Sequence, residues 1–527
     1  MNSSMPLKEQ AKLPVLPLTV VVIGAFMSFL DSSIVNVALP HMMSVFGVSS
    51  SDMQWVLTAY MLTSGIVIPT SAFLCERFGH RRVYIVSLII FTIGSALCGI
   101  SWSLNMIIAS RIIQAIGGGL IIPVSMAIVY NLAPREKMGT AMGIWGLAAI
   151  LGPSVGPTLG GYLLDTLSWE WIFFVNLPIG LITILLCPFY LKKTAINKTI
   201  KFDMLGTLFI AVSCFSLLLA LSKGTEWGWK SQSIISLLLV CLFTLAAFIV
   251  WEGSITNPLI DIRVFKNKVV VSSMISMSLL TIGMMGVIFI IPIYTENLLG
   301  YSPLKTGIMM MPMALISAFL MPVSGKIYDK YGAFHVGIIG VLIAIITTYN
   351  LKVLSLDTSY SNLQIMLAVR SIGFGLALMP ISNAAMGAVP EALAPTASAV
   401  VNTVRQVASS LGIAIMNYVL VVKQAYHQDV LHDLINYGSF TACQAINRLQ
   451  SLLMSMGTDS ASANIQALTI IKGLIVRQGA MDSIIDSIMT LVFMLLITVP
   501  FIFFLTPKKV EGARLRQQKQ LSQGSDS

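Results

Sequence analysis

Apolar stretches long enough to cross a lipid bilayer recur along the whole chain, and they constrain its fold more than any other feature. A transmembrane helix needs about 20 predominantly apolar residues. Of the 527 residues, 56% are hydrophobic and 10% are charged, against about 25% charged residues in ordinary soluble domains. The sequence therefore predicts an all-α polytopic membrane protein with about fourteen spans, at residues 18–40, 54–74, 84–103, 106–130, 140–164, 171–191, 204–222, 233–251, 269–295, 306–325, 334–352, 363–388, 397–422 and 484–505.

The formal net charge of +10 indicates membrane topology rather than nucleic-acid binding. Lys and Arg are retained in cytoplasmic loops of polytopic proteins. With the N-terminus inside, most basic residues fall in predicted inner segments and in the tail after Lys508, and the short outer loops hold Lys223, Lys230, Lys305 and Lys352. We therefore predict a multi-pass protein of the cell membrane with both termini in the cytoplasm, which requires an even number of spans.

Several kinds of chemistry lack their sequence patterns. No nucleotide-binding GxxxxGK[ST], zinc-protease HExxH, hydrolase GxSxG or paired Cys/His spacing is found,. Five of the six cysteines lie in or beside predicted spans, which implies no disulfide framework. The first apolar stretch is too long for a signal peptide and contains Asp31, so we expect it to remain as span one. We predict no enzyme activity, no cofactor and no metal site.

An internal repeat divides the chain. The segments AFLCERFG (72–79) and GKIYDKYG (325–332) share a small residue, an acid four positions later and a glycine three after that, at an offset of 253 residues. Duplicated halves are common in transporters. We predict an N-terminal six-span bundle over 1–192, two additional spans over 203–252 and a C-terminal six-span bundle over 266–507.

Two further segments complete this plan. The outer segment 425–483 has apolar residues at helical spacing, so we predict a helical hairpin there, packed over the outer mouth of the bundles. The tail 508–527 is basic and then rich in Gln and Ser, and we expect it to be a disordered cytoplasmic segment.

The predicted fifth span contains an unusual glycine and proline pattern, GPSVGPTLGG over 152–161. Glycines four residues apart lie on one helix face and let a neighbouring backbone approach closely. Prolines at the same interval remove backbone donors and bend the helix. The conformational role that we predict here involves Gly152, Pro153, Gly156, Pro157, Gly160 and Gly161.

These motifs resemble those of a known family. GLAAILGPSVGPTLGGYL (146–163) resembles the antiporter signature of major facilitator superfamily drug efflux proteins, and LDSSIVNVALP (30–40) resembles the first-span signature of their fourteen-span EmrB/QacA-type branch. WEWIFFVNLPIG (169–180), ERFGHRR (76–82) and NTVRQVASSLG (402–412) also fall where that branch has its motifs. The resemblance implies the major facilitator fold and a proton-coupled multidrug exporter of hydrophobic, often cationic, compounds.

Three charged residues are candidates for proton coupling. Asp31 is alone among charges in the first span, and acids inside membranes face cavities or partners and mark ion pathways. In the family the fourth-span arginine, which maps onto Arg111, is assigned to proton coupling. Glu296 is a third candidate. The alternatives are a packing hydrogen bond for Asp31, a static clamp on carbonyl groups for Arg111 and a solvated position for Glu296; a static role is also expected of Arg370 and Arg405.

The repeated loop motif is a candidate gate at the cytoplasmic face. Its acid can cap a helix N-terminus or pair with Arg across the two halves. The residues that we assign to this gate are Glu76, Arg77, Gly79, Arg81 and Asp329.

The expected partners are small hydrophobic substrates, protons and the lipid bilayer, and no nucleic acid; a periplasmic accessory protein stays open. Two other functions also stay open, export of one specific lipid or metabolite and a membrane sensor that transports nothing.

Overall fold

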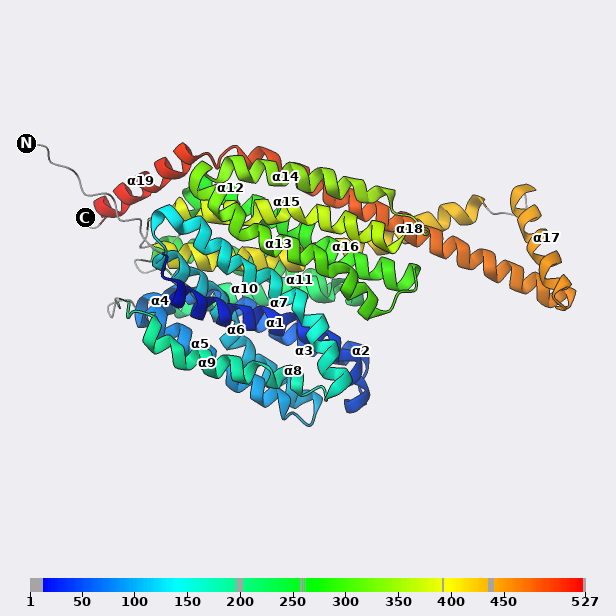
Figure 1. Cartoon of the computed structure of the whole chain (residues 1–527), viewed down its shortest axis with the longest axis horizontal. Coiled ribbons are helices and arrows are strands. Elements are labelled where there is room, and N and C mark those ends of the chain that lie inside the picture. The colour runs from blue at the N-terminus through cyan, green and yellow to red at the C-terminus, as the bar shows by residue number, and fades with distance from the viewer. Residues whose placement is uncertain are drawn as a thin grey trace, which may run out of the picture.

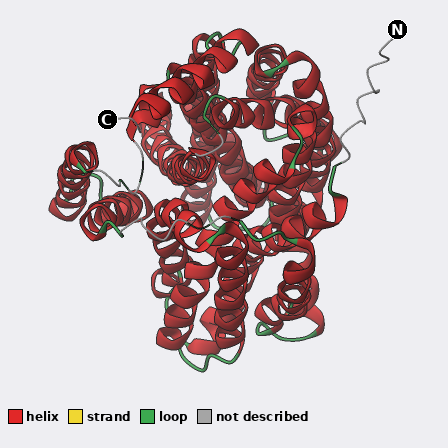
Figure 2. Cartoon of the chain, turned by 90° about the vertical axis from the view of Figure 1, so that its left-hand side faces the viewer, coloured by secondary structure: helices red, strands yellow, loops and turns green. Residues whose placement is uncertain are grey.

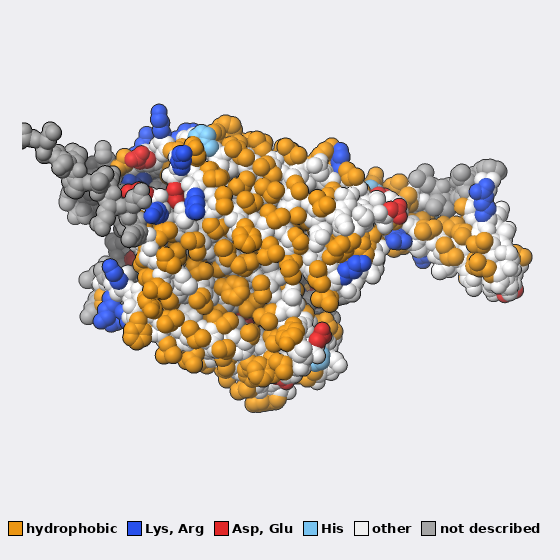
Figure 3. Space-filling view, viewed as in Figure 1, with side chains coloured by type: hydrophobic (Ala, Val, Ile, Leu, Met, Phe, Trp, Pro, Cys, Tyr) orange, Lys and Arg blue, Asp and Glu red, His pale blue; other side chains and the backbone are white. Residues whose placement is uncertain are grey.

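The computed structural model describes residues 13–524 apart from 195, 197–201, 256–257, 259, 261, 391–392 and 435–439. Within these residues all regular structure is helical, and 14 helical segments are long and apolar enough to cross a membrane. The predicted all-α fold with fourteen spans is therefore confirmed. Hydrophobic side chains cover the flank of the helical body, and basic side chains gather at its end near the termini (Figure 3).

The first six spans form one bundle. Their helices are α1 (Val15–Phe46), α3, η1 and α4 (Trp55–Val67, Ile68–Thr70, Ser71–Phe78), α5 (His80–Gly99), α6 (Leu104–Leu132), α7 (Met138–Thr166), and α8 with α9 (Trp171–Phe174, Asn176–Tyr190). The short α2 (Ser50–Met53) and η2 (Arg135–Lys137) lie in connections. Within the bundle, α1 packs against α7 and α9, and α5 packs against α6.

The last six spans form the second bundle. They comprise α12 (Lys268–Pro292) continued by the π-helical η4 (Ile293–Leu298), α13 (Pro303–Tyr331), α14 (Ala333–Asn350), α15 (Tyr360–Gly387), α16 (Ala394–Leu434) and α18 (Ser460–Ile502). The connections contain η3 (Ile262–Lys266) and η5 (Leu351–Val353). The repeated motif ends α4 at Gly79 and α13 at Gly332, whose φ angles are +85° and +78°. Glycine adopts positive φ without steric cost, which accounts for glycine at both positions.

The two additional spans are α10 (Met204–Trp227) and α11 (Gln232–Ser254). The helix α10 packs against α3 of the first bundle and α16 of the second, so it lies between them. The expected position of Lys223 in an outer loop is wrong, because α10 continues to Trp227. Lys223 is 2% exposed, and its Nζ lies 2.6 Å from Glu226 Oε2 and 5.4 Å from the ring centroid of Trp55.

Both described ends of the chain lie at one end of the bundle, which we call the termini side (Figure 1). The opposite end, from which α17 (Phe440–Ser455) and the first part of α18 project, is the hairpin side. Seen from the termini side, most helices run roughly along the line of sight (Figure 2).

The described residues of the outer segment 425–483 form the end of α16, the helix α17 and the start of α18, with a turn at 456–459, so the predicted helices are present. Its expected packing over the mouth of the bundles is wrong, because α17 packs against α18 and the pair projects away from the helical body (Figure 1). The apolar residues of this segment thus lie partly at the contact between the two helices themselves.

The expected disorder of the tail 508–527 is also wrong for its described part, which forms α19 (Pro507–Gly524). Its Lys, Arg, Glu, Ala, Leu and Gln residues favour helix. Val510 and Ala513 pack against the core cluster formed by both bundles.

Candidate functional site

The core of the first bundle contains a buried ion pair. Asp31, in the middle of α1, and Arg111, on α6, are 0% and 1% exposed, and Arg111 Nη1 lies 2.7 Å from Asp31 Oδ2. The other carboxylate oxygen, Oδ1, accepts hydrogen bonds from Gln114 Nε2 at 2.8 Å and Asn176 Nδ2 at 2.9 Å. Burying a charge is costly unless it is paired and hydrogen-bonded, and both oxygens of this carboxylate meet that requirement.

Further contacts fix the members of this polar cluster. Ser95 on α5 accepts from both Gln114 (3.2 Å) and Asn176 (3.0 Å) and donates to the Phe173 carbonyl (2.9 Å). The Arg111 guanidinium lies 4.1 Å from the ring centroid of Tyr60. Side chains from five spans therefore surround the ion pair. Asp31 contacts α6 and α9 directly and α5 through Gln114 and Asn176.

Sequence reasoning proposed Asp31 and Arg111 as separate candidates, and the structure brings them into contact. It did not assign a role to Gln114, Ser95 or Asn176. Uncharged polar residues are common in membrane helices, so these carried no signal by themselves. Asn176 lies in the quoted motif WEWIFFVNLPIG, which was the available clue.

The second bundle has a related cluster without an acid among its described residues. Arg370, 1% exposed, donates from Nε to Thr348 Oγ1 at 3.0 Å and from Nη2 to the Gly283 carbonyl at 2.6 Å. Thr348 corresponds to Ser95 at the same 253-residue offset as the repeated motif. The contacts of Arg370 fit the expected clamp on a carbonyl group. Among the described residues, the two clusters differ in that the arginine of the first is paired with an acid, Asp31, and Arg370 of the second binds neutral acceptors.

A cavity of about 740 Å³ lies between the two bundles. It extends from Ile122, Met321 and Met379 near the middle of the spans to Leu39, Gln54 and Asn417 near the hairpin side. Arg111 lines it, whereas Asp31 lies behind Arg111 with no exposed surface. The additional span α10 contributes Leu221, Ser222 and Thr225 to the wall, and Asn417 on α16 donates to Thr225 Oγ1 at 3.0 Å.

The glycines of α7 mediate two close contacts on opposite sides of that helix. A Cβ atom on Gly152 would come within 2.6 Å of Phe29 Cβ, and one on Gly156 or Gly160 would meet Ser33 or Ile34, all on α1. Gly139 and Gly143, nearer the termini side, approach α13 instead, at the backbone of Gly325 and Met321. The helix α7 therefore touches both bundles at backbone distance.

The prolines and the last glycine of the motif lie elsewhere. Pro153 lines the cavity, Pro157 is exposed, and a Cβ on Gly161 would meet nothing within 4 Å.

On the termini side the bundles are in contact. Asp329, at the end of α13, accepts from the backbone N–H of Gly139 (2.5 Å) and Thr140 (3.0 Å) and from the Thr140 hydroxyl (2.8 Å) at the start of α7. Tyr130 on α6 donates to the Met386 carbonyl at 2.9 Å. An acid at a helix N-terminus interacts favourably with the helix dipole. These contacts close the termini side of the cavity.

The corresponding residues of the first bundle lie at the end of α4. This helix, which carries Glu76 and Arg77, packs against α16 of the second bundle. Gly79 separates α4 from α5, which carries Arg81 in its first turn. The motif thus lies at a contact between the two bundles.

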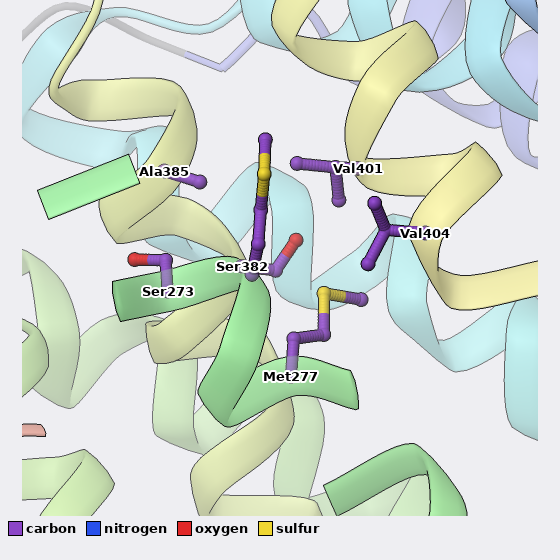
Figure 4. Close-up of a pocket in the computed structure, with 7 residues that line it drawn as sticks. Ser273, Met277, Ser382, Ala385, Val401 and Val404 are labelled. Atoms are coloured by element: carbon purple, nitrogen blue, oxygen red, sulfur yellow. The ribbon is translucent and has the colours of Figure 1, made fainter. Parts of the chain in front are cut away.

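A narrow gap lies beside the cavity toward the termini side, among α12, α15 and α16, and Met277 borders both spaces. Figure 4 shows Ser273 and Ser382 at this gap, opposite Val401 and Val404. The hydroxyl groups of Ser273, Ser276 and Ser382 are buried and have no hydrogen-bond partner among the described residues. Each such group costs about 1–3 kcal/mol.

Glu296 lies in η4 and is half-buried. It is absent from the described lining of the central cavity, which in this part of α12 ends at Phe289. The structure therefore does not bring Glu296 together with Asp31 and Arg111.

Comparison with known proteins agrees with this architecture. Residues 21–413 match the family model of the Major Facilitator Superfamily. The chain is 31% identical over 520 residues to an uncharacterized transporter of this type, YhcA of Bacillus subtilis, covering 98% of this chain and 97% of the relative. It is 30% identical to a multidrug resistance protein B homolog of Mycobacterium tuberculosis, covering 78% and 77%.

A lincomycin resistance protein of Listeria monocytogenes is 26% identical, covering 74% of this chain and 83% of the relative. Among solved structures, the human organic anion transporter MFSD10 has a TM-score of 0.59 at 15% identity, covering 92% of this chain and 100% of that one. The proton:xylose symporter XylE has a TM-score of 0.55 at 15% identity, covering 79% and 90%. The structural likenesses agree with the fold described above.

Proposed function

The chain belongs to the major facilitator superfamily, and from that membership and the buried Asp31–Arg111 pair beside the cavity we propose that it is a proton-coupled multidrug efflux antiporter of the fourteen-span branch. Small molecules are the substrates implied by the drug-resistance relatives. The protein is a transporter, and its work is alternating access of the cavity to the two sides of the membrane.

The distribution of basic residues supports placing both termini in the cytoplasm. The hairpin side then faces outward, and the contacts of Asp329 and Tyr130 close the cytoplasmic side. The conformation is accordingly outward-facing, with the cavity located toward the outside. The domain plan follows the same division, with bundles over 1–192 and 266–507 and the additional spans over 203–252 between them.

Proton coupling is the role that we propose for Asp31 and Arg111. A proton at Asp31 Oδ2 removes the negative charge that holds Arg111 and leaves the neutral oxygens of Gln114 and Val56 as its other acceptors. The guanidinium already lines the cavity, so its release moves a bulky cation into the space that substrate would occupy. Proton and substrate then exclude one another, which is the requirement for exchange.

The conformational role belongs to α7 and the loop motifs. The glycine face of α7 slides or rocks against α1 next to Asp31. Its N-terminus binds Asp329 in the outward-facing state and leaves it when the cytoplasmic side opens. Glu76, Arg77, Gly79 and Arg81 serve the equivalent contact of the first half.

The test is transport by purified protein in proteoliposomes with an imposed proton gradient. Wild-type protein should accumulate a hydrophobic dye against its concentration gradient, and Asp31→Asn should lose this activity while remaining folded. Glu296→Gln is the matched control, because Glu296 lies outside the described lining of the cavity, and it should retain activity. Gradient-driven accumulation by Asp31→Asn would contradict the proposal.

A further inference from the structure

The charges on the wall of the central cavity restrict the chemistry of its cargo. Building on the proposed export function, we propose that the cavity binds amphiphiles whose polar end carries hydrogen-bond acceptors and no positive charge, and that Arg405 holds this end. A carboxylate, sulfonate, phosphate or carbonyl oxygen would serve as the acceptor.

The described lining of the cavity contains two guanidinium groups, those of Arg111 and Arg405, and no carboxylate. Asp31, which lies behind Arg111, has no exposed surface, and its two oxygens are occupied by Arg111, Gln114 and Asn176. Its charge is therefore matched by Arg111, and Arg405 remains as the charge presented to cargo. A lipophilic cation in this space would be repelled by Arg405 with no acid on the lining to compensate.

Arg405 is held in a position suited to an acceptor. Its Nη2 donates to Asn402 Oδ1 at 2.7 Å, and Asn402 is fixed in turn by donating to the Ser398 carbonyl at 2.9 Å. The guanidinium carbon lies 5.7 Å from the ring centroids of both Phe29 and Trp145. An arginine carries five N–H donors, and Asn402 Oδ1 is the one hydrogen-bond acceptor recorded for this guanidinium among the described residues.

The rest of the wall fits an apolar body. Methionines from both bundles line the cavity, and their flexible, polarizable side chains adapt to different apolar shapes; they are Met61, Met277, Met284, Met285, Met321 and Met379. Phe29 and Phe289 add aromatic surface. An amphiphile can therefore place its body against these side chains and its acceptor at Arg405.

The test compares three probes by equilibrium binding to the full chain in nanodiscs, with the signal of protein-free nanodiscs subtracted. Anilinonaphthalene sulfonate carries an anionic acceptor, N-phenylnaphthylamine is the same ring system without the sulfonate, and ethidium is a hydrophobic cation. For wild-type protein we expect the sulfonate to bind about tenfold more tightly than the amine, the value of one charge-assisted hydrogen bond, and ethidium to bind most weakly.

Arg405→Gln should reduce the affinity for the sulfonate about tenfold, to that for the amine, and leave the amine unchanged. Arg405→Lys keeps the charge and should retain most of the sulfonate affinity. Ethidium binding as tightly as the sulfonate to wild-type protein, or an equal loss of sulfonate and amine binding in Arg405→Gln, would overturn the inference. If Arg405→Gln does not fold, the inference is tested by the ranking of the three probes on wild-type protein and by the sulfonate affinity of Arg405→Lys.

The two proposals fail separately. Binding is measured without a proton gradient, so the predicted ranking together with no gradient-driven transport would overturn the antiport function alone. Gradient-driven export of ethidium with no preference for the sulfonate would overturn this inference and leave antiport standing.

Discussion

At the scale of single residues, the site depends on how the Asp31 carboxylate is stabilised. Its Oδ2 is paired with Arg111, and its Oδ1 receives amide N–H groups from two different spans. Arg111 and the two amides thus satisfy both oxygens of a buried charged group.

Asn176→Ala removes one of these amide donors. The loss of a hydrogen bond to a buried charged group costs roughly 1.5–3 kcal/mol. We expect Asn176→Ala to lower the free energy of unfolding by about this amount and to reduce gradient-driven transport. The measurements are thermal unfolding of the purified protein and dye transport in proteoliposomes. The exposed Asn350 provides the control, because Asn350→Ala should change neither; unchanged stability and transport in Asn176→Ala would argue against the role of this hydrogen bond.

Gly156 tests the close approach of α7 to α1. A Cβ at this position meets Ser33 Oγ and lies 3.1 Å from the Ile34 nitrogen, whereas a Cβ on Gly161 meets nothing within 4 Å. Overpacking typically costs about 1–3 kcal/mol. We therefore expect Gly156→Ala to lower the thermal unfolding midpoint and the transport rate, and Gly161→Ala to change neither. Equal behaviour of the two variants in a thermal-shift and transport assay would remove the assigned role of the glycine face.

The sequence identified the charged residues of the site but not the contacts that they make. Asp31 and Arg111 were recognisable because a charge inside an apolar stretch is costly and rare. Their pairing, and the parts played by Gln114, Ser95 and Asn176, depend on bringing together residues as far apart as Asp31 and Asn176, which no local pattern encodes. The close approach of Gly143 to Met321 of α13 was not predicted, since spacing does not tell which neighbour a helix face meets.

At the scale of helices, span number and the repeat followed from apolar length and a shared motif. The position of the projecting hairpin could not be read in the same way, because helical periodicity shows that an apolar face exists but not what it packs against. The tail was predicted to be disordered because of its polar composition, although many of its residues favour helix. Its contact with the core through Val510 could not be read from the sequence.

The contact between α13 and α7 is a testable gate. Asp329→Ala removes three hydrogen bonds to the first turn of α7. Charge-assisted bonds of this kind contribute about 1–3 kcal/mol in favourable cases, so the closed termini side should lose about tenfold or more in relative population. Spin-label distances across the two bundles on this side should lengthen. Lys326→Ala, on an exposed position of the same helix, should not change them, and unaltered distances in Asp329→Ala would exclude this gate.

Removing the serine hydroxyls at the narrow gap should have the opposite effect and favour the closed state. The Ser273 and Ser382 hydroxyls have no hydrogen-bond partner within the described part of the chain in the closed arrangement, and water would satisfy them once the termini side opens. The double variant Ser273→Ala/Ser382→Ala should therefore favour the closed state and slow the transport cycle. Ser398→Ala is a control of opposite sign, because Ser398 donates to the Pro123 carbonyl across the bundles at 2.8 Å. Spin-label distances across the two bundles on the termini side test this prediction. Longer distances in the double variant would contradict it.

At the scale of the whole molecule, the additional span α10 is part of the wall between the two bundles, and α11 packs against α10. The helix α10 touches α3 and α16 and lines the cavity, so it closes a side of the space between the bundles. The two bundles are alike in plan but differ in chemistry, because Asp31 belongs to the first and Arg370 in the second binds neutral acceptors. In the proposed mechanism, one bundle therefore carries the exchangeable proton, and the other supplies Arg405 for cargo.

The absence of an acid from the described lining of the cavity has a consequence for the energy source. Exchange of one proton for a monovalent cation moves no net charge, whereas exchange for an uncharged molecule moves one charge inward, and for a monovalent anion two. Each charge gains about 2.3 kcal/mol per 100 mV, roughly fifty-fold in attainable concentration ratio. In proteoliposomes, a potassium diffusion potential of suitable sign, with equal pH on both sides, should therefore drive accumulation of the sulfonate probe by itself. Sulfonate transport that follows the pH difference and ignores the voltage would contradict exchange of a proton for this anion, because that exchange moves two charges inward.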